Sequence, residues 1–236
     1  NSLELTASGS GIVTFNVIAV DSASTPVTFN AVASTITVNP APTATSLTPS
    51  NTVLDSGQYV TYNVVINGGT LPITANLVLV SNTMPLQING ANAVPGMTVN
   101  TIVLSGSGSP VSNIITFNSL ELTASGSGIV TFNVIAVDSA STPVTFNAVA
   151  STITVNPAPT ATSLTPSNTV LDSGQYVTYN VVINGGTLPI TANLVLVSNT
   201  MPLQINGANA VPGMTVNTIV LSGSGSPVSN IITFNS

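Results

Sequence analysis

The stretch QYVTYNVVINGGTLPITANLVL, residues 58–79, decides the fold. On each side of Asn67-Gly-Gly, apolar residues alternate with Thr and Asn, and this period of two predicts a β-strand with one buried face. The Asn-Gly-Gly segment tolerates positive φ and therefore predicts a tight connection between the two strands. The expected buried positions are Val60, Tyr62, Val64, Ile66, Ile73, Ala75, Leu77 and Leu79.

The same alternation predicts two further strands later in the chain. The first buries Val130, Phe132, Val134 and Ala136, and the second begins with Val144, Phe146 and Ala148. The apolar phase then changes at Ala148-Val149, so that the later inner face consists of Val149, Ser151, Ile153 and Val155. Because a slip of one residue exchanges the two faces of a strand, we expect a β-bulge there, and a bulge or short turn at Asn118-Ser119.

Turn residues separate these strands at regular intervals, and no segment keeps a helical period over three turns. The turn segments are Asp55-Ser-Gly, Asn67-Gly-Gly, Asn89-Gly, Pro95-Gly and Gly106-Ser-Gly-Ser-Pro110. Many short strands joined by Gly- and Pro-containing turns are typical of a sandwich. The sequence therefore predicts an all-β protein built of Ig-like β-sandwiches.

The chain repeats itself with a period of 117 residues. Residues 1–117 and 118–234 are identical letter for letter, and Asn235-Ser236 begins a third copy. A fixed period is the signature of a repeat architecture. Because surface positions are repeated as faithfully as core positions, every unit offers its neighbours the same contacts, which favours a structural building block over a catalyst.

The domain boundary is predicted at Asn156-Pro-Ala-Pro159, which repeats Asn39-Pro-Ala-Pro42. Two prolines in four residues prevent ladder pairing and favour a stiff, extended linker. We therefore expect residues 1–40 to be the C-terminal part of one Ig-like repeat, 41–157 a complete repeat, and 158–236 the N-terminal part of another. Residues 1–40 could then complete a fold with residues like 158–236, either from a neighbouring chain or from a continuation of the same chain.

Composition excludes several classes of function. Of 236 residues none is Lys, Arg or His, none is Cys, and the six acidic residues give a net charge of -6. Without basic side chains the chain has nothing to neutralise phosphate, so we expect no nucleic-acid partner. No apolar run approaches the roughly 20 residues that span a bilayer, so no membrane insertion is expected in this segment. The first residues, Asn1-Ser-Leu-Glu-Leu, do not read as a signal peptide.

Two segments carry a family resemblance. Gln58-Tyr-Val-Thr-Tyr, followed by Asn67-Gly-Gly-Thr-Leu-Pro72, is similar to the opening G-Q-x-V-T-x … G-G-T-x-P of polycystic-kidney-disease-type and related Ig-like surface repeats. Gly128-Ile-Val-Thr-Phe-Asn-Val-Ile-Ala-Val-Asp138-Ser resembles their late strand, G-x-Y-x-V-x-V-x-V-x-D-x. The chain departs from the family in its longer unit and in Ile73, where an aromatic residue is usual. The resemblance implies tandem, exported sandwich modules of archaeal or bacterial cell surfaces, as in adhesins, surface layers (S-layers) and extracellular filaments, and it transfers no catalytic residue.

The acidic residues are predicted to be structural. Asp55, in Asp55-Ser-Gly-Gln-Tyr59, is expected to cap its own turn, with Gly57 in the unusual backbone conformation. Asp138 follows a strand and is also expected to cap a turn, because calcium usually requires several carboxylates and each repeat has only three. Glu121 and Asp138 are not expected to act as a glycosidase pair, since the chain lacks Trp for sugar stacking.

No catalytic, cofactor-binding or metal-binding residue is therefore predicted, and no cofactor. Gly106-Ser-Gly-Ser-Pro110 lacks the Lys and the helix of a phosphate-binding loop. The chain has no Asn-x-Ser/Thr sequon, which leaves O-linked glycans on Ser or Thr as the class of sugar modification open to it.

The leading hypothesis is a structural subunit of an extracellular filament or surface lattice, with identical repeats packed head-to-tail, assembling with itself by strand donation between neighbours. The alternative is the stalk of a cell-surface adhesin, which a divergent binding domain would identify. A third hypothesis, a carbohydrate-binding accessory domain, would need exposed aromatic residues.

Overall fold

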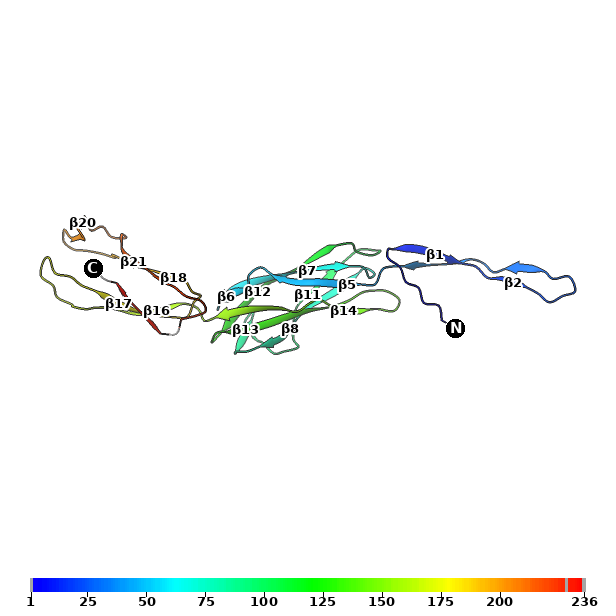
Figure 1. The fold of residues 1–236 in the computed structure, drawn as a ribbon, viewed down its shortest axis with the longest axis horizontal. Helices are drawn as coiled ribbons and strands as arrows, with labels where there is room; N and C mark the ends of the chain where they lie inside the picture. The colour runs from blue at the N-terminus through cyan, green and yellow to red at the C-terminus, as the bar shows by residue number, and fades with distance from the viewer. Residues whose placement is uncertain (1, 228, 235–236) are drawn as a thin grey trace.

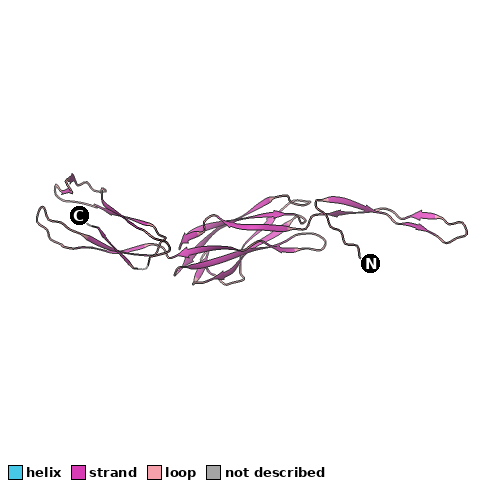
Figure 2. Ribbon diagram, in the orientation of Figure 1, coloured by secondary structure: helices cyan, strands magenta, loops and turns pink. Residues whose placement is uncertain are grey.

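The computed structural model describes residues 2–227 and 229–234, and every regular element in them is a β-strand. The described chain is elongated (Figures 1 and 2), with three parts in line. We call residues 2–38 the N-terminal arm, residues 43–156 the middle unit, and residues 160–234 the C-terminal sheets. The middle unit lies between the other two, so the arm and the C-terminal sheets are at opposite ends of the molecule (Figure 1).

The middle unit consists of two sheets. The first has the order β10-β9-β12-β7-β5, and the second has the order β11-β8-β13-β15-β6, with β14 beside β13. All neighbours are antiparallel except β15 and β6, which are parallel. The bounds are β5 Thr43–Pro49, β6 Val53–Asp55, β7 Gln58–Asn67, β8 Ile73–Asn82, β9 Leu86–Ile88, β10 Ala91–Asn92, β11 Thr98–Leu104, β12 Asn113–Ala124, β13 Gly128–Val137, β14 Thr145–Asn147 and β15 Ser151–Asn156.

The core lies between the two sheets and confirms the predicted alternation. All eight positions expected on β7 and β8 are fully buried, as are the four expected on β13. They form one apolar cluster together with β12, and Tyr62 of the first sheet meets Phe132 of the second with ring centroids 5.2 Å apart. Two layers with their apolar faces turned inwards give the unit a sandwich-like character.

The prediction for residues 144–155 is correct in part. Ala148, Ile153 and Val155 are buried, but Val144 is exposed and Val149 is 70% exposed. The register explains the difference, because Asn147 lies opposite Ile135 and Ser151 lies opposite Phe132. Residues 148–150 therefore face only residues 133–134, and Val149 falls in this bulged segment rather than on an inward-facing strand position.

The expected irregularity at Asn118-Ser119 is confirmed, since the register between β12 and β7 shifts between Phe117 and Leu120. The turn predictions also hold where they can be compared. Gly57, Gly68, Gly69, Gly90, Gly96, Gly106 and Gly108 all have positive φ.

The N-terminal arm is a long, narrow hairpin with two ladders. Its strands are β1 Gly11–Phe15, β2 Ile18–Val20, β3 Thr28–Asn30 and β4 Ser34–Val38. β1 pairs with β4 in the register Gly11 opposite Val38, which is the register of β13 and β15 in the middle unit. β2 pairs with β3 in the register of β13 and β14. The arm thus forms the same ladders as residues 128–155.

The C-terminal sheets have the same correspondence to the first part of the middle unit. Their strands are β16 Thr160–Pro166, β17 Tyr179–Asn184, β18 Ile190–Val195, β19 Gln204–Ile205, β20 Ala208–Asn209, β21 Thr215–Leu221 and β22 Asn230–Phe234. They form three sheets, β16-β17-β22, β18-β21 and β19-β20. Each ladder keeps the register of its counterpart in the middle unit, including the shifts after Thr162 and Leu194.

Truncating Phe132 should destabilise the middle unit more than truncating a neighbour on the outer face. Phe132→Ala removes a fully buried ring that packs on Tyr62, and we expect a loss of about 3–5 kcal/mol in the free energy of unfolding. Ile129→Ala, on the same strand but half exposed, should cost less than about 1 kcal/mol. Urea unfolding of both variants measures the difference, and equal losses would contradict the assigned core.

The Tyr62 hydroxyl predicts a loss of stability in alkali. It is buried without a hydrogen-bond partner, and burial raises the pKa of Tyr62 above its ordinary value. In the unfolded chain the tyrosine hydroxyl ionises at about pH 10. Below this pH Tyr62 leaves the free energy of unfolding unchanged, and above it the free energy of unfolding falls by up to about 1.4 kcal/mol per pH unit.

Tyr62→Phe should remove this dependence and should not destabilise the fold at pH 7, because it deletes an unpaired polar group. Urea unfolding of the wild type and the variant between pH 7 and pH 11 tests both points. If the free energies of unfolding of the two proteins change with pH in the same way, the assignment to Tyr62 is wrong.

Candidate assembly interface

The structure places Asp138 as a turn cap, as predicted. Its Oδ1 accepts a hydrogen bond from the Val144 amide at 2.8 Å, and its Oδ2 accepts one from the Thr70 amide at 3.1 Å. The carboxylate therefore closes its own loop and also ties that loop to the β7–β8 connection. Among the described residues no group of three His, Cys, Asp or Glu is placed to hold a metal ion.

Glu121 and Asp138 belong to different sheets. Glu121 is on β12 of the first sheet, where its Oε2 accepts a hydrogen bond of 3.4 Å from the Tyr59 hydroxyl. Asp138 directly follows β13 of the second sheet. The fold thus gives each carboxylate a separate partner instead of joining them in one site.

Asp55 does not cap its own turn, contrary to the prediction. Gly57 takes positive φ as predicted, but the side chain that closes the turn is Gln58, whose Oε1 accepts a hydrogen bond from the Asp55 amide at 2.9 Å. The Asp55 carboxylate instead accepts a hydrogen bond of 2.7 Å from the hydroxyl of Thr187, which belongs to the C-terminal sheets. Asp55 is therefore part of a contact between units.

This contact, which we call the joint, surrounds the Pro-containing linker. The Thr187 hydroxyl donates to Asp55 and accepts from Asn156 Nδ2 at 2.8 Å. The backbone adds two bonds, from the Gly186 amide to the Pro157 carbonyl at 2.8 Å and from the Ser56 amide to the Asn156 carbonyl at 2.7 Å. Because Asn156 is buried and all these groups are paired, the joint fixes the C-terminal sheets to the end of the middle unit.

Gly185 shows why the Asn-Gly-Gly motif is more than a turn. A Cβ atom on Gly185 would collide with the Ala158 carbonyl, and one on Gly186 would lie 2.9 Å from Pro159 Cβ. Both glycines also have positive φ. The linker backbone thus rests on the glycine pair, a packing role that only the assembled units reveal.

The same joint forms in part between the arm and the middle unit. Asn39 Nδ2 donates to the Thr70 hydroxyl at 2.8 Å, and the Gly69 amide donates to the Pro40 carbonyl at 2.9 Å. Among the described residues no carboxylate accepts from the Thr70 hydroxyl, although its amide donates to Asp138, and Asn39 Oδ1 is buried without a partner. One half of the joint is therefore in place, and its acidic half is not.

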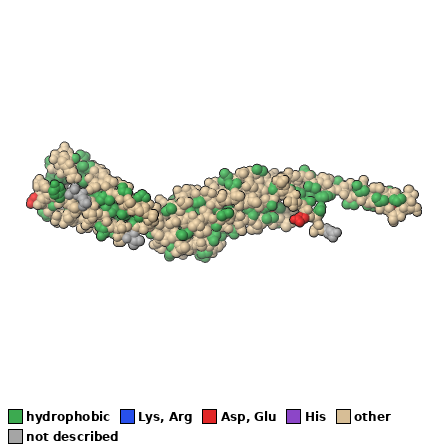
Figure 3. Space-filling model, in the orientation of Figure 1, with side chains coloured by type: hydrophobic (Ala, Val, Ile, Leu, Met, Phe, Trp, Pro, Cys, Tyr) green, Lys and Arg blue, Asp and Glu red, His purple; other side chains and the backbone are tan. Residues whose placement is uncertain are grey.

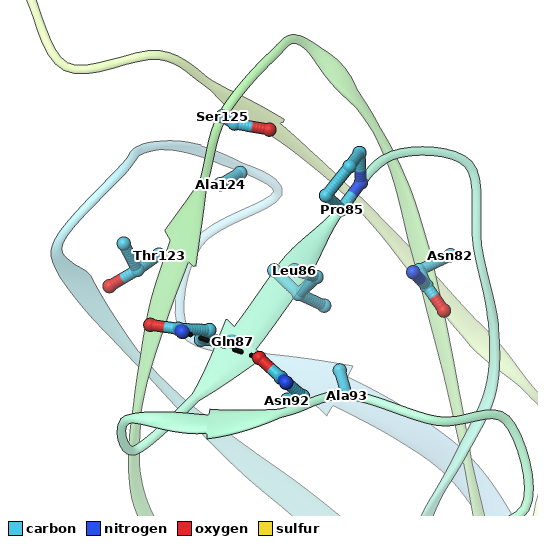
Figure 4. Close-up of a pocket in the computed structure, with 9 residues that line it drawn as sticks. All are labelled: Asn82, Pro85, Leu86, Gln87, Asn92, Ala93, Thr123, Ala124 and Ser125. Atoms are coloured by element: carbon cyan, nitrogen blue, oxygen red, sulfur yellow. Dashed lines mark hydrogen bonds between the residues drawn. The ribbon is translucent and has the colours of Figure 1, made fainter.

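A shallow hollow of about 620 Å³ opens beside β9 of the middle unit (Figure 4). Three of its polar side chains form hydrogen bonds within the protein: Gln87 Nε2 donates to Asn92 Oδ1 at 3.3 Å, and Asn82 Nδ2 donates to the Met84 carbonyl at 2.7 Å. None of the residues that line it carries a titratable group. They are Asn82, Pro85, Leu86, Gln87, Asn92, Ala93, Thr123, Ala124 and Ser125.

The C-terminal sheets have an open core. Two cavities of about 530 and 690 Å³ lie between their strands and are lined mainly by apolar side chains. Identical residues show what is missing: Leu54 is 3% exposed but its counterpart Leu171 is 39% exposed, and Met84 is 7% exposed but Met201 is 63% exposed. The apolar face that the middle unit buries is therefore accessible here.

The N-terminal arm presents the matching apolar residues. Phe132 is fully buried in the middle unit, whereas its counterpart Phe15 is 41% exposed, and Val17 and Ile36 are likewise exposed where Val134 and Ile153 are buried. Hydrophobic side chains are visible along the arm and over the C-terminal sheets in Figure 3. Complete burial of such a side chain stabilises by about 1.5–3 kcal/mol, so a contact that covered these residues would be strongly favoured.

No known family model matches the chain, and no curated protein sequence matches it significantly. Among the described residues there is no helix long and apolar enough to cross a bilayer.

The hydrogen bonds of the joint predict that Thr187 limits the orientations of the C-terminal sheets relative to the middle unit. Thr187→Val removes the hydroxyl shared by Asp55 and Asn156, so we expect a broader range of orientations of the C-terminal sheets. Because the chain has no cysteine, spin labels can be placed on cysteines at the exposed positions Val103 and Val220. Electron–electron double resonance should give a narrow distance distribution in the parent and a wider one in Thr187→Val.

Thr70→Val is the matched control, since Thr70 stands at the other joint and its hydroxyl is bonded to Asn39 of the linker before the middle unit. Its distance distribution should equal that of the parent. Equal distributions in all three proteins would show that the Thr187 hydroxyl does not fix the joint.

Proposed function

We propose that the protein is a structural subunit of an extracellular filament or surface lattice, in which Ig-like sandwich repeats follow one another in series. The single observation that carries this proposal is the joint. It links units through groups that the sequence repeats unchanged, Asn156 and Asp55 on one side and Thr187 on the other. A contact between identical units that does not close on itself generates an open array.

The arrangement of the chain supports a mechanical role. The three parts are in line, and the two ends expose complementary sets of strands, which are the sites at which strand donation joins neighbours. The repeat has no basic side chain, and the exposed strand positions of the middle unit are largely Ser, Thr and Asn. In this role the partner of the protein is a further copy of itself, with O-linked glycans as the modification that such a surface accommodates.

Electron microscopy of the purified chain tests the proposal. Chain 1–236 should form unbranched, thin filaments whose length increases with protein concentration, because the end-to-end contact is bimolecular. Sedimentation velocity on the same samples should show a matching distribution of polymers. A chain that remains an extended monomer at millimolar concentration would overturn the filament and favour the alternative, a passive stalk of an adhesin.

A further inference from the structure

We propose that residues 2–38 of a second copy of this chain bind the open C-terminal sheets and complete their sandwich. This inference rests on the proposed function and names the partner segment of that contact and its register. The occupant is specified by sequence, since residues 2–38 are identical to residues 119–155. In the middle unit those residues cover the face that is open in the C-terminal sheets.

The strand edges of the two parts are complementary. In the middle unit β8 pairs with β11 on one edge and with β13 on the other, whereas β18, its counterpart, pairs only with β21 among the described residues. Conversely, β13 pairs with both β15 and β8, whereas in the described part of the chain β1 pairs only with β4 and β2 only with β3. Each part thus exposes the backbone edge that the other would satisfy.

The arm already has the conformation in which it would bind. Its two ladders have the registers of β13 with β15 and of β13 with β14, so docking requires no strand to be re-paired. A segment that is ordered before it binds loses less conformational entropy on binding. The C-terminal sheets are ordered in the same way, because their ladders keep the registers of the middle unit.

The register of the middle unit fixes the pairs expected between copies. Val134 lies opposite Leu77 and Val137 opposite Thr74, so Val17 should lie opposite Leu194 and Val20 opposite Thr191 of the other copy. On the far edge Val155 lies parallel to Leu54, so Val38 should lie beside Leu171. These contacts bury Phe15 and Leu171, which the separate parts leave exposed.

The same docking completes the half-formed joint. Asp55 accepts from Thr187 at the joint inside the chain, and the residue equivalent to Asp55 in the C-terminal sheets is Asp172. When the arm binds, Asp172 of the accepting copy comes close to Thr70 of the donating copy. Its carboxylate then accepts a hydrogen bond from the Thr70 hydroxyl. Asn39 already donates to Thr70 from the arm. Every joint along the array would then contain the same three residues.

Among the described residues, this contact can form only between two molecules. The arm and the C-terminal sheets lie at opposite ends of the chain with the middle unit between them, so an arm cannot reach its own C-terminal sheets (Figure 1). Each copy then donates at one end and accepts at the other, which is a head-to-tail contact.

Two chains with one cysteine each test the register directly. Val20→Cys is placed in one chain and Thr191→Cys in the other, both at exposed positions, and neither chain contains another cysteine. The two chains are mixed, treated with a short bis-maleimide and resolved by denaturing electrophoresis. We expect a cross-linked heterodimer as the main product, at least tenfold above either chain treated alone, because facing Cβ atoms on paired strands are about 4.5–5.5 Å apart.

Two controls define the outcome. Val137→Cys with Thr74→Cys in one chain has the same pair inside the middle unit and should cross-link internally. Val20→Cys mixed with Val195→Cys should give little product, because Val195 is four residues along the same strand, about 13 Å from Thr191. A heterodimer yield with Thr191→Cys no higher than with Val195→Cys, while the internal control reacts, overturns the inference.

The result is separate from the test of the proposed function. If filaments form without the cross-link between positions 20 and 191, the proposed function stands and the proposed contact is wrong. The cross-link in closed dimers, without filaments, would keep the contact and reject the filament.

Discussion

The pairing of β13 with β8 is the interaction on which the rest of the structure depends. It joins the second part of the repeat to the first, and its ladder extends from Val130 opposite Asn82 to Val137 opposite Thr74. Through β13 it also holds β15, which in turn supports β6 by parallel pairing. Where this ladder forms, the two sheets enclose a core, and where it does not, the same sequence remains as separate ladders.

The chain therefore contains its own comparison of a closed and an open unit. Identical side chains change from buried to exposed when the strand opposite them is absent, as Leu54 and Leu171 show. The cause is the two-layer architecture, since neither sheet can bury its apolar face alone. Unpaired edges and exposed apolar faces are sites where further strands can add, and this is the physical basis of the proposed assembly with copies of the same chain.

The sequence predicted local features well because they depend on near neighbours along the chain. The alternation at Val60–Ile66 and the turn at Gly57 need only a period and a residue that tolerates positive φ, and both are confirmed. Val149 was placed wrongly because its exposure depends on a bulge opposite β13. The partner of the Asp55 carboxylate could not be predicted, since Thr187 is 132 residues away and no local pattern connects them.

Because the same sequence occurs in a closed and in an open unit, the effect of the sequence can be separated from the effect of the tertiary structure. The sequence by itself set the β character, the turn positions and the register of the ladders that recur in both copies, because β5–β7 and β16–β17 pair alike in a closed and an open unit. The tertiary structure decided how far each strand extends. β7 begins at Gln58, but β17 begins at Tyr179, four residues later in the repeat, and Val53–Asp55 forms β6 whereas its counterpart at residues 170–172 forms no strand. The reason is that a strand persists only where a neighbour accepts its backbone hydrogen bonds, and residues 58–60 and 53–55 find those neighbours in β12 and β15.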